Sequence, residues 1–235
     1  MRRWPWVCAF MLLLALLATM PMRFALGLFG LDRAGLSVRS AEGTLWSATL
    51  RGVQFGDIQV GDVYAGVSPW RLMTGETRLL LWRPALGGAP ALGLAIGNGL
   101  WGTTLEGRTA SLPTGAVFAP LPIAQLDLAE VAVRFVGNRC AAAHGRVTAR
   151  LAGDVAGIAL AQGLSGTARC AGGALELPLA SQAGTERATL TLYGDGRFRA
   201  TFEVTPAAPE IAARLAATGF QAVGPAYRLS AEGRF

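Results

Sequence analysis

The stretch Glu42–Leu50, EGTLWSATL, decides the fold because the period of the sequence changes there. Gly43 interrupts the preceding pattern. From there on, Thr44, Trp46, Ala48 and Leu50 alternate with Leu45, Ser47 and Thr49. A period of two predicts a half-buried strand rather than a helix. We predict that Gly43 lets the chain turn into this strand and that Trp46 and Leu50 contribute to the core of a sheet. A second interpretation, in which Trp46 lines a groove for a partner or a lipid, stays open.

The residues before this stretch contain a long apolar run. Residues 4–22, WPWVCAFMLLLALLATMPM, carry no charge and would form a helix of about 28 Å, close to the hydrocarbon thickness of a bilayer. A cleaved signal peptide is the rival interpretation, but Met20 and Met22 stand where its cleavage site needs small residues. We therefore expect an uncleaved transmembrane anchor with residues 1–3 in the cytoplasm. The expected span is marked by Trp4, Trp6, Leu12, Leu17 and Met22.

The charge of the chain does not indicate nucleic-acid binding. The net charge is +6 and all the cationic side chains are Arg, but they are scattered singly through the 235 residues. A nucleic-acid-binding protein would show a basic stripe or a recognisable motif, and neither is present. Weak attraction to anionic lipid or to acidic partners is the simpler expectation.

The rest of the chain reads as antiparallel β structure in two parts. Short apolar runs punctuated by Gly predict a meander over residues 23–112, with a tight turn at Asn98–Gly99. Three prolines between positions 113 and 122 predict a bend or an edge, because Pro cannot donate to a sheet ladder. Alternation resumes over residues 123–235, where one short helix is expected at 209–218.

The clearest hairpin is ATLTLYGDGRFRATFEV, residues 188–204. Asp195 and Gly196 are turn-forming residues between two alternating runs. Phe198 and Phe202 fall on the same face of the returning strand, so both are predicted to be core residues.

Two of the three cysteines share the same local sequence, Arg-Cys-Ala, at Cys140 and Cys170. Cys8 lies within the apolar run and cannot reach them. We expect Cys140 and Cys170 to form a disulfide, which would add about 3–4 kcal/mol and would place the domain outside the cytoplasm. Two reduced core cysteines are the alternative.

Catalytic chemistry has little support in the sequence. The single histidine, His144, lies near a predicted turn, and Ser165 in GLSGTA does not fit a nucleophile elbow. No His or Cys pair has metal-ligand spacing. We therefore expect no catalytic residues, no metal and no cofactor, and we expect the chain not to be an enzyme.

Several features are similar to the type II secretion system protein N family of Gram-negative bacteria. The resemblance is carried by Gly43–Ser47 (GTLWS), by Ser68-Pro69, by Leu72 followed by Gly75, and by the closing stretch 215–235, LAATGFQAVGPAYRLSAEGRF. In two places this sequence departs from the family: Ala48 replaces a usual Gly, and Tyr64 a frequent Trp.

The resemblance implies a non-enzymatic, single-pass inner-membrane subunit with a periplasmic β domain. Such a subunit would help to link or stabilise the inner-membrane platform and the outer-membrane channel that export folded proteins. The implied partners are other type II secretion subunits, in the platform and as a further candidate the secretin. The alternative from a different class is a membrane-anchored periplasmic β-groove that carries or senses lipid.

Overall fold

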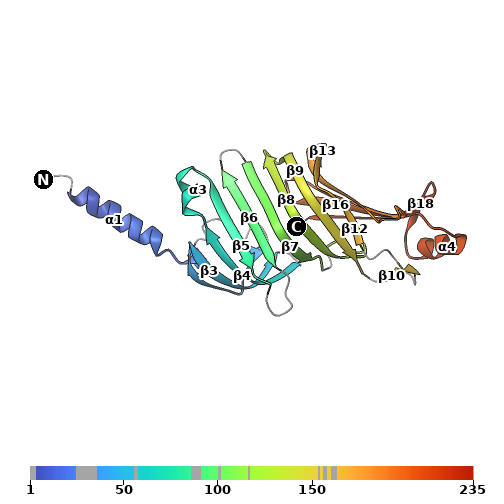
Figure 1. Ribbon diagram of the computed structural model, residues 1–235, viewed down its shortest axis with the longest axis horizontal. Helices are drawn as coiled ribbons and strands as arrows, with labels where there is room; N and C mark the ends of the chain where they lie inside the picture. Colours follow the sequence, from blue (N-terminus) through green and yellow to red (C-terminus); the bar gives the residue numbers. More distant parts are fainter. Residues whose placement is uncertain are drawn as a thin grey trace.

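The computed structural model describes residues 4–24, 36–55, 58–85, 91–99, 102–115, 117–152, 154–155, 158–159 and 163–234. Figure 1 shows an elongated molecule built mainly from one twisted sheet. Helix α1 (Trp4–Ala18) projects from one end, and helix α4 (Pro209–Ala217) lies at the opposite end. The predicted β architecture is confirmed.

The main sheet has sixteen strands and every neighbouring pair is antiparallel, as expected for a meander. Along the sheet the order is β1-β3-β4-β5-β6-β7-β8-β9-β12-β14-β15-β16-β18-β17, with β2 beside β3 and β13 beside β14. Before the proline-rich segment the strands are β1 (Leu36–Ser37), β2 (Ser40–Thr44), β3 (Ser47–Phe55), β4 (Ile58–Val67), β5 (Thr77–Arg83), β6 (Leu92–Gly99) and β7 (Gly102–Pro113).

After that segment come β8 (Ile123–Val136), β9 (Arg139–Leu151), β12 (Gly163–Thr167), β13 (Arg169–Ala171), β14 (Ala174–Ala180), β15 (Glu186–Leu192), β16 (Arg197–Val204), β17 (Gln221–Val223) and β18 (Ala226–Arg234). A separate pair is formed by β10 (Asp154–Val155) and β11 (Ile158–Ala159).

The hairpin of β15 and β16 forms as the sequence predicts. Leu192 pairs with Phe198, and the turn between them is closed by a hydrogen bond from the Tyr193 N–H to the Arg197 carbonyl, 2.9 Å. Buried residues alternate with more exposed ones along β16, and Phe202 is fully buried. One face of this strand therefore supplies the core.

The buried apolar residues form two clusters on the sheet. The first lies over β3 to β7, where β4 and β7 contact each other although β5 and β6 separate them in the sheet. Strong curvature therefore lets one face of the sheet cover itself. The fully or almost fully buried members include Met22, Leu50, Val53, Val63, Ala65 and Ala110.

The second cluster is covered by elements outside the sheet. Leu215 of α4 is fully buried, and Phe220 after the helix packs edge-on against Phe202. From the proline-rich segment, Phe118 packs edge-on against Phe198, with ring centroids 5.3 Å apart. These additions cover the apolar face that would otherwise be open to water.

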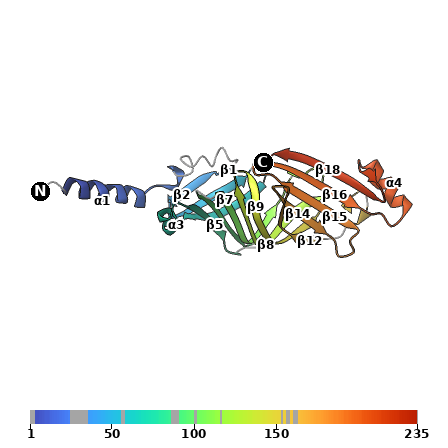
Figure 2. The same cartoon turned by 90° about the horizontal axis from the view of Figure 1, so that it is seen from above.

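The sheet is continuous across the proline-rich segment. Strands β7 and β8 pair from Thr103 opposite Phe135 to Pro113 opposite Gln125, and Figure 2 shows these central strands joining the two halves. Leu128 packs against both buried clusters. The division of the chain at residues 113–122 into two parts stays a prediction.

Helix α1 is shorter than the span that the sequence predicts. It ends at Ala18, because Pro21 lacks the N–H that would continue the helix, and Met22 packs into the first cluster with only 1% of its surface exposed. Among the described residues no helix has both the length and the apolar character that crossing a bilayer requires. Residues 1–3, and the side chains of Trp6 and Leu17, lie outside the description.

Two local predictions are wrong. Leu45 and Trp46 form the turn between β2 and β3, so the strand expected through Trp46 is a hairpin. Asn98 and Gly99 remain paired in the sheet, opposite Thr103 and Gly102, so the turn does not begin at Asn98. Alternation continues through Leu45 and Trp46 and concealed that turn, whereas Asn98 and Gly99 are turn-forming residues that remain in the ladder.

Candidate functional site

The end of α1 is fastened to the β2–β3 hairpin. The Trp46 indole N–H donates to the Ala18 carbonyl, 3.1 Å, and the Leu45 N–H donates to the Met20 carbonyl, 2.8 Å. Pro21 pairs with Thr44 in an isolated β-bridge. These contacts, together with buried Met22, fix the helix end to the sheet.

Trp46 packs its half-buried ring against the first cluster, and it also makes a polar contact that the sequence does not predict. Its indole nitrogen donates to the last residue of α1, Ala18. Gly43 makes the close approach in this hairpin possible. Its φ is +112°, and a Cβ atom there would lie 2.5 Å from the Ser47 carbonyl oxygen.

Helix α3 (Pro69–Met73) follows β4 directly and was not foreseen from the sequence. Ser68 before Pro69 is a helix-start signal, but five residues are too few to show a helical period. The Ser68 N–H donates to the Arg78 carbonyl, 3.0 Å, and Arg71 pairs with Glu76 at 2.9 Å. The short helix is thereby bound to β5.

The outer face of β4 and β5 carries exposed aromatic side chains. Tyr64 and Trp82 stack with ring centroids 5.9 Å apart and are 44% and 40% exposed. Leu80 lies on the same face, two residues from Trp82. Gly66 lies opposite Leu80, and Gly93 lies opposite Trp82. Because glycine has no side chain, backbone rather than a side chain borders Leu80 and Trp82 at these positions.

A depression of about 350 Å³ continues this face over β5 to β7. Its floor is apolar, with Leu80, Trp82 and Ala95, and its rim carries Arg78 and Arg108. Arg78 forms an ion pair with Glu106 across β6. Such a surface can hold a small apolar group next to a cationic side chain.

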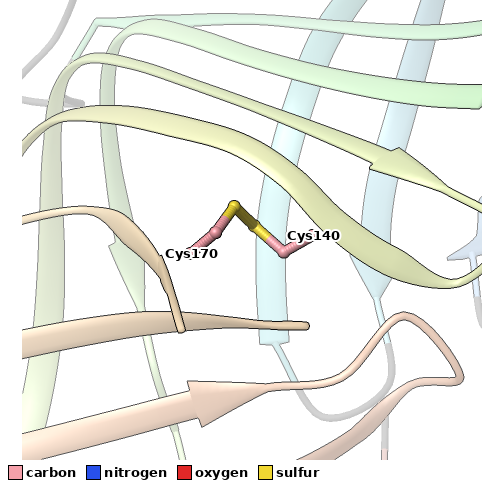
Figure 3. Close-up of a disulfide and its surroundings, with 2 residues drawn as sticks. All are labelled: Cys140 and Cys170. Carbon is pink, nitrogen blue, oxygen red and sulfur yellow. A yellow bond between two sulfur atoms is a disulfide. The ribbon is translucent and has the colours of Figure 1, made fainter. Parts of the chain in front are cut away.

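The disulfide between Cys140 and Cys170 is present, as predicted. It joins β9 to β13 (Figure 3). The two sulfur atoms are 1.99 Å apart and the two Cα atoms 5.5 Å apart. The Cys140 N–H also donates to the Gly173 carbonyl, 2.8 Å. The bond therefore ties the hairpin of β8 and β9 to the hairpin of β13 and β14.

A polar cluster crosses the middle of the sheet at Asp127 on β8. Its carboxylate accepts hydrogen bonds from Ser111, from Gln125 at 2.6 Å and from Arg150 at 2.9 Å. Burial raises the pKa of Asp127, but the hydrogen bonds and the Arg150 charge outweigh it and hold the pKa below its ordinary value. The cluster fixes the alignment of β7, β8 and β9.

The edge formed by β18 is open over most of its length. One side of β18 pairs with β16 from Tyr227 to Arg234, whereas β17 covers only Ala226–Arg228 on the other side. In the part of the chain that the structure describes, no strand lies beside residues 229–234 on that side. An open edge offers backbone donors and acceptors to a further strand.

His144 lies on β9 opposite Ala132 and is exposed. Within the described ranges, no group of three or more His, Cys, Asp or Glu side chains could hold a metal ion. The structure thus adds no geometric support for acid–base or metal chemistry at His144.

Residues 34–230 match the family model of the type II secretion system (T2SS), protein N. No curated protein and no solved structure gave a match. The matched range includes β1 to β17 and the first part of β18, so it covers almost the whole sheet. The resemblance drawn from the sequence motifs is confirmed. Because the match covers most of the 235 residues, the chain belongs to the type II secretion system protein N family.

Proposed function

We propose that this chain is a non-enzymatic inner-membrane subunit of the type II secretion machinery. The apolar segment that contains α1 anchors it, and the β domain, whose core includes Met22, lies in the periplasm, where it links or stabilises the inner-membrane platform and the outer-membrane channel. The family match over residues 34–230 carries the proposal, because it assigns nearly the whole sheet to a component of this machinery.

The disulfide supports the proposed compartment. Disulfides persist in the periplasm and are rare in the cytosol, where thiols are kept reduced. Cys140 and Cys170 both lie in the β domain, whereas the free Cys8 lies in α1. This distribution fits a chain whose sheet is periplasmic.

The open edge of β18 supports a linking function by binding. A partner strand added beside residues 229–234 would gain main-chain hydrogen bonds without rearranging the sheet. Two ion pairs, Arg199 with Glu232 and Arg228 with Glu203, lie across β16 and β18 beside this edge. Charges near an edge discourage indiscriminate pairing and so favour a specific partner.

Secretion of a reporter substrate tests the function in a strain that lacks the chain. The full chain should restore secretion, and a domain that starts at Ala18 behind a cleavable signal, and so keeps the contacts of Met20 and Met22, should restore much less, because tethering supplies local concentration. Restoration by no version of the chain would contradict the assignment. A fully active released domain would contradict the need for the anchor.

Photo-crosslinking tests the proposed edge in the same strain. A photoreactive residue at exposed Ser230 should crosslink to another secretion subunit. Arg187 is the matched control, because it is exposed but lies on β15 between two strands. Equal crosslinking from both positions, or none from Ser230 in an active strain, would contradict a partner at this edge.

A lipid-carrying β-groove is the second candidate, and the depression over β5 to β7 favours it. Leu80, Trp82 and Ala95 could contact an acyl chain while Arg108 faces an anionic headgroup. Mass spectrometry of lipids that co-purify with the chain distinguishes the candidates. A stoichiometric lipid that is lost in Ala95→Arg while the chain stays folded, but is retained in Ala142→Arg at an exposed position of β9, would favour the lipid function.

A further inference from the structure

Helix α3 presents a tryptophan that the fold does not use. Trp70 is 77% exposed, which is the highest value among the large apolar side chains described outside α1. Leu72 on the same helix is 36% exposed. Neither belongs to a buried cluster. One exposed apolar side chain is normal on a protein surface, so the meaning of Trp70 depends on the residues and the helix end that lie beside it.

The position of α3 is set by the end of α1. The Met20 carbonyl accepts a hydrogen bond from the Leu45 N–H, and the Leu45 carbonyl accepts one from the Val67 N–H, 2.9 Å. Ser68 follows Val67 and precedes α3. Only these few bonds separate the start of α3 from the end of α1, and both views show α3 at the end of the sheet from which α1 projects (Figures 1 and 2).

A second exposed aromatic residue lies at the same junction. Phe24 is 59% exposed, and the Arg23 guanidinium stands 5.3 Å from the centre of its ring. On α3, Arg71 lies between Trp70 and Leu72 in the sequence and its side chain is half exposed. Aromatic side chains with neighbouring arginines are typical of the headgroup level of a bilayer, where the rings are partly buried and the charges meet phosphates.

We propose that α3 is an interfacial membrane contact: Trp70 inserts at the headgroup level of the bilayer that α1 enters. The proposal rests on the membrane anchor proposed above. Continuity with α1 identifies the occupant, because a bilayer around α1 would end between Ala18 and Met20, and the hydrogen bonds hold α3 near Met20.

A second contact changes what the anchor does. A single helix fixes the domain to the membrane but allows helix and domain to tilt together relative to the membrane plane. Contacts from both α1 and α3 would fix the orientation of the domain as well as its position. The sheet and its open β18 edge would then face one way relative to the membrane plane.

Quenching of tryptophan fluorescence by brominated lipid tests the contact. The full chain is placed in nanodiscs of phosphatidylethanolamine and phosphatidylglycerol, with and without phosphatidylcholine brominated near the headgroup. The emission of Trp70 is the difference between the wild-type chain and Trp70→Tyr, so the signals of Trp4 and Trp6 cancel. The difference in emission between the wild-type chain and Trp82→Tyr is the control. Trp82 is also exposed, but it lies on β5, farther than Trp70 from the end of α1.

We expect brominated lipid to quench the Trp70 difference emission and to leave the Trp82 difference emission unchanged. Absence of quenching for Trp70 overturns the proposal, and so does equal quenching of both, which would place the whole outer face on the membrane. Loss of secretion in Trp70→Tyr with unquenched Trp70 would assign α3 to a protein partner and would also overturn it.

A spin label gives a measurement that does not depend on changing Trp70. A nitroxide at Thr74→Cys, one helical turn from Trp70 and exposed, in a chain that carries Cys8→Ser, should be more accessible to oxygen than to a water-soluble nickel chelate. The control is Val223→Cys on β17, at the opposite end of the sheet. The same accessibility at both positions would contradict the proposal.

These experiments separate failure of the inference from failure of the anchor. A chain that does not co-elute with the nanodiscs has no membrane anchor, so the proposed function loses its anchor and the inference falls with it. A chain that co-elutes but shows unquenched Trp70 emission overturns only the contact made by α3.

Discussion

The Trp46 indole nitrogen donates a hydrogen bond to the Ala18 carbonyl, 28 residues earlier in the chain. This contact joins α1 to the β2–β3 hairpin. It gives Trp46 two separable contributions: its half-buried ring packs on the first cluster, and its N–H satisfies the carbonyl of the last residue of the helix.

Two substitutions separate those contributions. Trp46→Phe should lower the free energy of unfolding by about 1 kcal/mol, the usual value of one hydrogen bond. Trp46→Ala also removes the ring and should cost more, but less than the roughly 3–5 kcal/mol of a fully buried aromatic side chain. Thermal unfolding of the full chain in detergent measures both, with Trp82→Phe as control. An unchanged melting temperature in Trp46→Ala, combined with loss of a partner, would make Trp46 a contact residue.

The disulfide should be important for stability. It closes a separation of 30 residues, so replacing both Cys140 and Cys170 by Ser should lower the free energy of unfolding by about 3–4 kcal/mol. Non-reducing peptide mapping should find this single link with Cys8 free, and chemical denaturation gives the loss in stability. Cys8→Ser is the control and should match the wild type. Equal stability of the double variant and the wild type would mean that the bond adds nothing beyond the sheet.

Asp127 should make stability depend on pH at the acid end. Its folded pKa lies below the ordinary value of 3.8, so its stabilisation is complete above that value and is lost as the pH falls through the folded pKa. Asp127→Asn should therefore cost on the order of 1 kcal/mol at pH 7 and much less near pH 2. Denaturant titrations across this range measure the difference.

The exposed pair of Arg51 and Glu42, 3.3 Å apart, supplies the control for Asp127. Glu42→Gln should change stability little at neutral pH, because exposed ion pairs contribute little. A cost for Asp127→Asn that stayed constant from neutral to acid pH would show that its hydrogen bonds do not depend on the carboxylate charge.

His144 should be dispensable for function. His144→Ala should leave reporter secretion and protein abundance unchanged, since the side chain is exposed on β9. Secretion assays and immunoblotting of the same cells measure both. A stable and abundant His144→Ala chain without activity would overturn the non-enzymatic assignment.

The strands were predictable because their burial follows the alternation of the sequence. The hairpin at Asp195–Gly196 shows this best, since turn residues stand between two clearly alternating runs. The turn at Leu45–Trp46 was not predictable in the same way, because neither residue is a usual turn former and the alternation runs through them. Turn-forming residues at Asn98–Gly99 were equally misleading, since both remain in the ladder.

The candidate surfaces were harder to foresee than the strands. The local sequence around Cys140 and Cys170 was sufficient for the disulfide, whereas the open edge of β18 depends on how little of it β17 covers. The importance of Trp70 follows from long-range contacts that bring Val67 to Leu45 and Leu45 to Met20. No period of the sequence records such contacts.

The bridge between Pro21 and Thr44 has a mechanical consequence. A load on α1 reaches the β2–β3 hairpin directly, because the helix end is bonded to that hairpin before the chain enters residues 25–35. Helix and hairpin would then move together, and a change in the tilt of α1 would pass to the sheet at this end of the molecule.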